Sequence, residues 1–155
     1  MDAIERFTNA AQIVNVSVAV ERFPEGTRTA KDAAAAVGCE LAQIVKSLVF
    51  VGGGEPYLVL TSGKNRVDES LVAELLEVGS ISIASPEQAR EATGFVIGGT
   101  PPFGHFRPIP TTLDKDLLAY DVVWAAAGTP DTCFPINPRK LQEVTSAVVA
   151  SVVTA

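Results

Sequence analysis

One lysine interrupts one of the most apolar stretches of the chain. Lys46 lies in the run Ile44 to Val51, where Leu48 and Phe50 share its face of an extended strand. Burying an unpaired ammonium costs free energy or lowers its pKa. Such a lysine therefore either lies at the start of the strand and extends to water, or forms the floor of a pocket. On a pocket floor, its charge could bind an anion or a polarised carbonyl.

Four glycines and four prolines gather between residues 94 and 110. Glycines let a backbone approach a ligand and direct N–H groups at it, while prolines stiffen the loop. The loop could hold a carbonyl or phosphate oxygen as an oxyanion hole does, or it could simply connect a helix to a strand. It lacks the Gly-Lys-Ser/Thr ending of a P-loop and the strand–GxGxxG–helix context of a dinucleotide site.

A third feature is the pair Gly128 and Thr129, which follows three alanines. It could line a pocket wall or form a turn between two strands. His105, at the end of the glycine- and proline-rich loop, is either a binding residue or an ordinary polar loop residue. Four basic residues fall in expected loops, where they could contact phosphates or be solvated surface charges. They are Arg22, Arg28, Lys64 and Arg66.

The composition is that of a folded globular protein. The 155 residues are 47% hydrophobic and 19% charged, and this length predicts a single domain spanning residues 1–155. The net charge of −6 argues against a protein that coats nucleic acid by charge alone, since such proteins need a broad basic surface. A small basic site on an acidic body is still compatible with that charge.

Cysteine and histidine usage narrows the chemistry. The two cysteines, Cys39 and Cys133, are too few for a disulfide-stapled scaffold. With His105 as its one histidine, the chain cannot build a site from two or three histidines, so we expect no metal and no cofactor. The N-terminus does not resemble a signal peptide, and no apolar run is long enough to span a bilayer. We therefore expect a cytoplasmic protein without membrane contact, with the apolar last ten residues in the core.

These residues must be positioned by short helices and strands. Capping residues and helical spacing predict helices over residues 2–12, 29–38, 68–77, 85–94 and 137–145. The apolar face of the third should contain Leu71, Leu75, Leu76 and Val78. Apolar runs and alternation predict strands over residues 15–20, 44–51, 57–61, 81–83, 109–113, 122–127 and 132–136. Because helices and strands do not alternate strictly, we expect an α+β fold. Its sheet should be mixed and mostly antiparallel, or a distorted barrel, surrounded by about five helices.

Taken in order, three segments resemble the YbaK/EbsC family, the free-standing relatives of the editing insertion domain of bacterial prolyl-tRNA synthetase. They are Ile-Val-Lys-Ser-Leu-Val-Phe at 44–50, Thr-Gly-Phe-Val-Ile-Gly-Gly-Thr-Pro-Pro-Phe-Gly-His at 93–105, and the stretch 121–134 around Trp124 and Gly128. The resemblance runs from about residue 30 to 145. It implies the mixed sheet or distorted barrel described above.

The resemblance also implies an activity. Members are aminoacyl-tRNA deacylases, which hydrolyse the ester between a wrong amino acid and the 3′ end of tRNA. The residues it places at the reaction are Lys46, Gly98 and Pro102. Those expected to contact the substrate are Ser47, Gly99, Thr100, Pro101, His105, Gly128 and Thr129. The implied substrate is a small amino acid, Cys or Ala, on tRNA(Pro), and prolyl-tRNA synthetase is an implied partner.

The residues themselves fit this reaction. An aminoacyl ester is already activated, so loop N–H groups and a lysine cation could suffice to stabilise the developing oxyanion. No general base is evident, which is consistent with attack by water or by a group of the substrate. Two alternatives remain: a catalytically silent module of the same fold that binds aminoacyl-tRNA or a nucleotide, and a subunit that docks on a tRNA synthetase.

Overall fold

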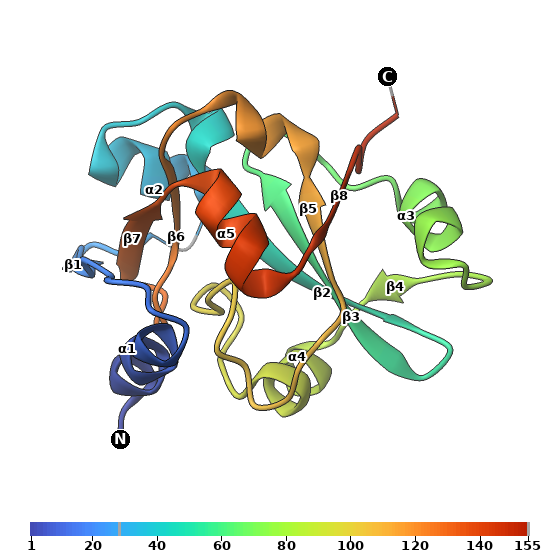
Figure 1. Cartoon of the computed structure of the whole chain (residues 1–155), viewed down its shortest axis with the longest axis horizontal. Helices are drawn as coiled ribbons and strands as arrows, with labels where there is room; N and C mark the ends of the chain where they lie inside the picture. The colour runs from blue at the N-terminus through green and yellow to red at the C-terminus, as the bar shows by residue number, and fades with distance from the viewer. Residues whose placement is uncertain (28, 155) are drawn as a thin grey trace.

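The computed structural model describes residues 1–27 and 29–154, so Arg28 lies outside the described residues. The helices are α1 (Ala3–Ile13), α2 (Ala30–Val37), α3 (Glu69–Leu76), α4 (Pro86–Thr93) and α5 (Pro138–Thr145), with 3₁₀ turns η1 (Leu41–Gln43) and η2 (Lys115–Ala119). The strands are β1 (Glu21–Arg22), β2 (Val45–Gly52), β3 (Glu55–Ser62), β4 (Ser82–Ile83), β5 (Thr111–Asp114), β6 (Val123–Ala126), β7 (Thr132–Ile136) and β8 (Val148–Ala150). All five predicted helices are present (Figure 1).

Helix boundaries follow the capping residues. Thr29, Asp68 and Ser85 each accept a hydrogen bond from a backbone N–H of the first turn that follows. Ser85 and Gln88 complete a reciprocal capping box. Gly38 and Gly94 end their helices in the left-handed conformation, which glycine adopts without steric penalty. Local sequence chemistry therefore determines where most helices begin and end.

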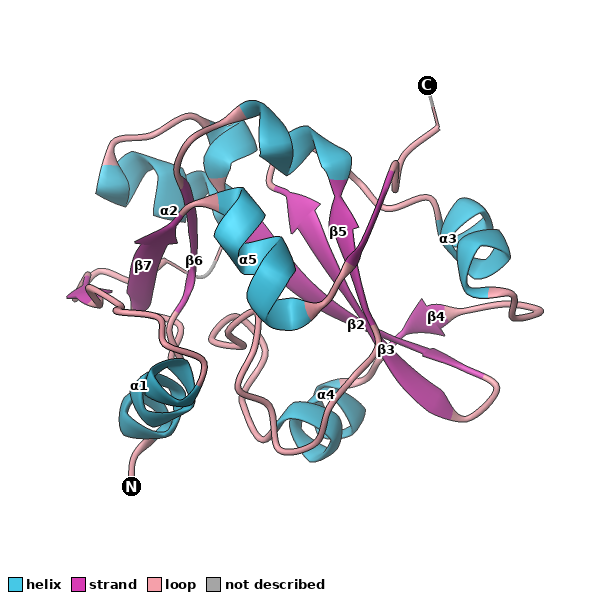
Figure 2. Ribbon diagram, viewed as in Figure 1, coloured by secondary structure: helices cyan, strands magenta, loops and turns pink. Residues whose placement is uncertain are grey.

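The strands form two sheets, ordered β4-β2-β3-β5-β8 and β1-β7-β6. Strand β3 pairs with β5 and β5 with β8 in parallel, while the other pairs of neighbours are antiparallel. The prediction of a mixed, mostly antiparallel sheet is confirmed. The sheets do not close into a barrel; one isolated bridge, Ile44 to Trp124, links them. Figure 2 shows the smaller sheet at the left and the larger one at the centre.

The larger sheet is built on the hairpin β2–β3. Gly53 and Gly54 form its two-residue turn with φ of +59° and +81°, the conformation that a tight hairpin turn requires. The resulting register pairs Lys46 directly with Thr61. Because side chains alternate along a strand, this register decides which residues share a face with the lysine.

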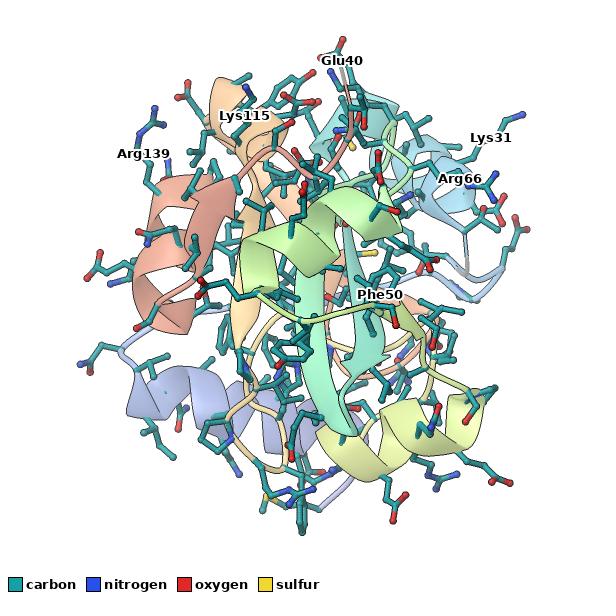
Figure 3. The ribbon with its side chains drawn as sticks, turned by 90° about the vertical axis from the view of Figure 1, so that its right-hand side faces the viewer. Lys31, Glu40, Phe50, Arg66, Lys115 and Arg139 are labelled. Carbon is teal, nitrogen blue, oxygen red and sulfur yellow. The ribbon has the colours of Figure 1, made fainter. Side chains whose placement is uncertain are left out.

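Both faces of the larger sheet are covered. Val49 and Leu60 lie in the main core, together with residues of α1, β6 and β7. Phe50 and Val59 pack on the opposite face, under α3. Figure 3 shows α3 across this face, with Phe50 below it. The sheet is therefore apolar on both sides, as expected for a central layer.

The predicted apolar face of α3 is partly wrong. The helix buries Val72 and Ala73, whereas Leu75 is 46% exposed. Leu76 and Val78 do pack against the second core. The helix therefore contacts the sheet through Val72 and Leu76, one position later than the predicted pair Leu71 and Leu75.

Two strand predictions also need correction. Residues 15–20 form no strand; Val16, Val18 and Val20 pack against the core, but no neighbouring strand supplies hydrogen bonds. The alternation there reflects burial without pairing. The expectation that the apolar C-terminal segment lies in the core is confirmed only in part: Val152 is fully buried, whereas the edge strand β8 leaves Val148 67% exposed.

Helix α1 braces the middle of the molecule. The Phe7 ring is fully buried and lies 5.1 Å from the ring of Phe103 and 4.8 Å from that of Phe134, centroid to centroid. Phe103 belongs to the glycine- and proline-rich loop and Phe134 to β7. One aromatic side chain thus holds a helix, a loop and a strand together.

We predict that Phe7→Ala lowers the free energy of unfolding by about 3–5 kcal/mol, because it leaves a cavity among three packed elements. Ile13→Ala is the matched control: this side chain lies on the same helix and is 81% exposed, so its loss should change stability by less than about 0.5 kcal/mol. Urea denaturation measures both. Equal destabilisation by the two variants would contradict the bracing role.

Candidate functional site

A cavity of about 520 Å³ opens along one edge of β2. Strand β2 pairs with β3 over its whole length, but on its other side it pairs with β4 only at Phe50 and Val51. The edge around Ser47, between the bridge at Ile44 and the Val49 carbonyl, therefore faces the cavity. The remaining walls come from α2, from Trp124 and its neighbours on β6, from β7, and from the loop that contains Gly98.

The open edge directs polar backbone groups toward this cavity. The Val49 carbonyl accepts a hydrogen bond from the Ala84 N–H at 2.9 Å, which places it on the open side. Alternate residues of a strand direct their N–H and C=O groups to the same side, so those of Ser47 also face the cavity. The Ser47 hydroxyl is buried without a hydrogen-bond partner among the described residues. Ser47 thus offers a ligand both backbone and side-chain groups.

Lys46 lies at the beginning of the same strand and also lines the cavity. Its side chain is half-buried, and its Nζ donates a hydrogen bond to the backbone carbonyl of Asn65 at 2.6 Å. Burial lowers the pKa of the Lys46 ammonium, and the negative charge of Asp114 opposes that shift. An ammonium has three N–H donors; with one held by Asn65, the others are free to serve a ligand.

The Asn65 carbonyl is held in turn by a buried carboxylate. Asp114 is fully buried at the end of β5 and accepts hydrogen bonds from Ser62 N–H at 3.0 Å, Asn65 Nδ2 at 2.8 Å and Asp116 N–H at 3.0 Å. Asn65 Nδ2 also donates to Asp116 Oδ2 at 2.9 Å. Sequence reasoning missed Asn65 and Asp114, although an aspartate at the end of an apolar strand was an available signal.

The glycine- and proline-rich loop reaches the cavity through Gly98 and Thr100. Gly99 faces away from it and packs against the turn after β6: a Cβ on Gly99 would lie 2.7 Å from Thr129 Cα and 3.0 Å from the Gly128 oxygen. Gly128 and Thr129 therefore support the loop from behind and do not line the cavity.

The remaining predicted loop residues also lie off the cavity. Pro101 and Pro102 are buried. His105 Nε2 hydrogen-bonds to the Pro101 carbonyl at 2.7 Å, and its ring stands edge-on to that of Phe95. Burial lowers the pKa of His105. The imidazole is placed to stiffen the loop and not to contact a ligand in the cavity.

Small and neutral side chains make up the opposite wall, and sequence reasoning missed them. They include Thr27, Ala33, Ala125, Thr132 and Cys133. Burial raises the pKa of the Cys133 thiol, which keeps it uncharged, and its Sγ lies 3.7 Å from Thr27 Oγ1. No carboxylate or imidazole is among the described residues that line this cavity.

The predicted phosphate-contacting residues lie on the surface. Arg22 forms an ion pair with Asp131 at 3.7 Å, and Lys64 one with Asp116 at 3.8 Å. Arg66 is exposed, and within residues 1–27 and 29–154 it forms no ion pair. None of the three lines the cavity. Arg28 was predicted with them and lies outside the described residues.

Two absences hold for the part of the chain that the structure describes. It contains no cluster of three or more His, Cys, Asp or Glu side chains that could hold a metal ion. Nor does any helix in it have the length and apolar character needed to cross a membrane.

The cavity thus combines a lysine cation, an unpartnered hydroxyl and free strand-edge backbone groups. Such groups can bind and polarise a carbonyl or hold an anionic oxygen. Without a general base among its described lining residues, the cavity suits a substrate whose bond is already activated, and an ester meets that condition.

Comparison with known proteins points the same way. The family model of the aminoacyl-tRNA editing domain matches residues 24–144. A crystal structure of a proposed trans-editing enzyme for prolyl-tRNA synthetase superimposes with a TM-score of 0.94 at 46% identity, over 100% of this chain and 99% of the other.

Among curated proteins, YwhH of Bacillus subtilis, which is uncharacterised, is 30% identical over 80% of this chain and 79% of its own length. EbsC of Enterococcus faecalis, a proposed Cys-tRNA(Pro)/Cys-tRNA(Cys) deacylase, is 24% identical over 85% of this chain and 81% of its own. Proline–tRNA ligase of Limosilactobacillus fermentum is 30% identical over 74% of this chain, which spans 21% of that enzyme.

The family match covers most of the chain, and the fold agrees over its whole length. The chain belongs to the aminoacyl-tRNA editing domain family.

Proposed function

We propose that residues 1–155 act as one trans-editing deacylase, which hydrolyses the ester of a mischarged small amino acid, Cys or Ala, on tRNA(Pro). The observation that carries this proposal is the cavity at the unpaired edge of β2, which is lined by both Lys46 and Ser47 and at which the Ser47 hydroxyl has no partner among the described residues. The similarity to EbsC and to a proposed prolyl-tRNA synthetase trans-editing enzyme supports the choice of substrate.

In this proposal the ester carbonyl lies against β2. The Ser47 N–H and the Lys46 ammonium stabilise the negative charge that develops on the carbonyl oxygen as a nucleophile attacks. Removing one such donor from a protease raised its activation barrier by roughly 2.7–4 kcal/mol. Two donors would therefore provide a large part of the rate acceleration over uncatalysed hydrolysis of the ester. The nucleophile is water or a hydroxyl or thiol of the substrate, because no carboxylate or imidazole that could act as a general base is among the described residues that line the cavity.

In this proposal, the small side chains on the wall opposite β2 determine which amino acid the cavity accepts. Ala33, Ala125 and Cys133 leave room for a small side chain. A pocket of this kind discriminates by about 1–3 kcal/mol for each methylene that does not fit.

The partners follow from the same relatives. We propose tRNA(Pro) as the carrier and prolyl-tRNA synthetase as an associated protein, since this chain matches part of proline–tRNA ligases. The reaction would take place in the cytoplasm, where tRNA is charged. The loop residues Pro101, Pro102, His105, Gly128 and Thr129 would act by holding Gly98 and Thr100 in place, with Gly99 as the point of contact.

Lys46→Ala should lower the rate of deacylation by about 100-fold or more, because it removes the only cation that lines the described cavity. The measurement is release of amino acid from tRNAs charged with Cys, Ala, Ser, Thr and Pro. Lys140→Ala, on α5 and paired with Glu143, is the control and should retain full activity. If the wild-type protein releases none of the five, deacylation is refuted; tight binding without release would instead identify a binding module.

Gly99→Ala should impair both stability and activity, because its Cβ would collide with the backbone of Thr129. We expect a loss of about 1–3 kcal/mol in unfolding free energy and a reduced deacylation rate, as Gly98 and Thr100 move. Gly79→Ala is the matched control, since a Cβ there meets no atom within 4 Å. Full activity of a folded Gly99→Ala protein would argue against the supporting role of this contact.

Arg66→Ala should weaken tRNA binding and reduce the slope of log affinity against log salt by about one, as expected for one lost phosphate contact. Arg139→Ala is the control: this arginine is also exposed but lies on the other side of the view in Figure 3. Filter binding at several salt concentrations measures both slopes. The same change in the two variants would show that Arg66 makes no particular contact.

A further inference from the structure

We propose that Asp114, with Asn65 as its link, is a positioning residue for Lys46. Asp114 would fix the loop whose carbonyl holds the ammonium and keep the lysine cationic for the reaction; the inference rests on the proposed deacylase function.

The geometry forms a continuous chain of contacts from carboxylate to ammonium. Asp114 Oδ2 accepts from both Ser62 N–H and Asn65 Nδ2, which lie at the two ends of the turn after β3. That turn presents the Asn65 carbonyl to Lys46 Nζ at 2.6 Å. Without the carboxylate, two donors at its ends would lose their shared acceptor. Asn65 would then be held only by Asp116 Oδ2 and the Ser62 carbonyl, so the position of its own carbonyl would be less tightly fixed.

Sheet register places the same residues in one row. Lys46 pairs with Thr61 across β2 and β3. On the other side of β3, Leu60 pairs with Leu113 in parallel, so the next residues along, Thr61 and Asp114, continue the row on the face of Lys46. The ammonium and the carboxylate are therefore separated by one strand and connected through Asn65.

The carboxylate of Asp114 also affects the pKa of Lys46. Burial disfavours the charged form of Lys46, whereas the carboxylate of Asp114 favours it. Asp114 is fully buried, so water screens its charge less than it would at the surface. Among residues 1–27 and 29–154, the other charged or titratable groups that contact this network or line the cavity are Asp116 with its partner Lys64 and, on the far wall, Cys133.

The sign of the pH effect follows directly. A lysine that acts as a cation loses its effect as pH rises through its pKa. Removing the negative charge of Asp114 lowers that pKa further, so activity should fall at a lower pH than in the wild type. A role that is only structural would lower stability and would not shift the titration of Lys46.

Thr61 provides a matched control. It lies between Lys46 and Asp114, is fully buried, and its hydroxyl has no hydrogen-bond partner among the described residues. Thr61→Val keeps nearly the same shape and removes no hydrogen bond seen in the structure. A nonspecific disturbance of this row of the sheet would affect Thr61→Val as well.

The experiment combines NMR titration of ¹³C-labelled lysine with single-turnover deacylation. The Lys46 resonance is assigned by its absence in Lys46→Ala. For Asp114→Asn we expect a lower Lys46 pKa and a kcat reduced by about tenfold to a hundredfold, as for a small displacement of a reacting group, with KM changed much less. Thr61→Val should match the wild type in both measurements.

Thermal unfolding shows whether Asp114→Asn folds. If it does not, Asn65→Ala replaces it: this variant keeps the carboxylate and frees the loop, so kcat should fall while the Lys46 pKa stays closer to that of the wild type. In a folded Asp114→Asn protein, an unchanged Lys46 titration or an unchanged kcat overturns the proposal. An unchanged kcat in Asn65→Ala also overturns the proposal. So does a loss of kcat in Thr61→Val as large as that in Asp114→Asn. If the wild-type protein is inactive, the proposed function fails and the titration alone tests the link to Asp114.

Discussion

Around Ser47, between the bridge at Ile44 and the bonded carbonyl of Val49, strand β2 is hydrogen-bonded on one side only, and the site depends on that gap. A fully paired strand would present side chains to its surroundings but would use all of its backbone groups. Strand β4 pairs with β2 over two residues only, and the isolated bridge to β6 lies at Ile44, before β2 begins. The backbone of Ser47 is therefore left to a ligand, and the surrounding helices and loop form walls around it. In the proposed mechanism, this open edge takes the place of the glycine-rich nest that many other enzymes build for an oxyanion.

The same strand must carry a cation into a largely apolar sheet. The structure resolves this conflict by placing the lysine at the end of the strand, where the sheet gives way to a polar turn. The compensating carboxylate lies two strands away and not in direct contact. A direct ion pair would occupy the ammonium, whereas contact through a carbonyl leaves part of it free. The charge of Lys46 is thus compensated by Asp114, and part of its ammonium still remains available to a ligand.

Sequence patterns predicted the local structure well, because caps, glycine turns and apolar runs act over a few residues. Thr29 and Ser85, which begin two of the predicted helices, are examples. Sequence patterns failed where the structure depends on a partner that is distant in the sequence. The alternating residues 15–20 have no strand to pair with. Asp114 contacts Asn65 only because β5 lies beside β3 in the sheet. For the site, the sequence indicated Lys46, Ser47, Gly98 and Thr100, which the fold gathers at one cavity. It could not separate these from Gly99, Gly128 and His105, because lining a cavity and supporting a loop require the same residue types.

The segment matched by the family model and the segment that makes the fold are not the same. Phe7, in the centre of the main core, precedes the matched range, and β8, which covers the edge of β5, follows it. An editing domain of this kind embedded within a longer enzyme would therefore have to obtain these two supports from its host. Free-standing and embedded forms could share every residue of the cavity and still differ in rigidity, according to what packs behind the loop. The evolutionary unit of chemistry is in this sense smaller than the unit of folding.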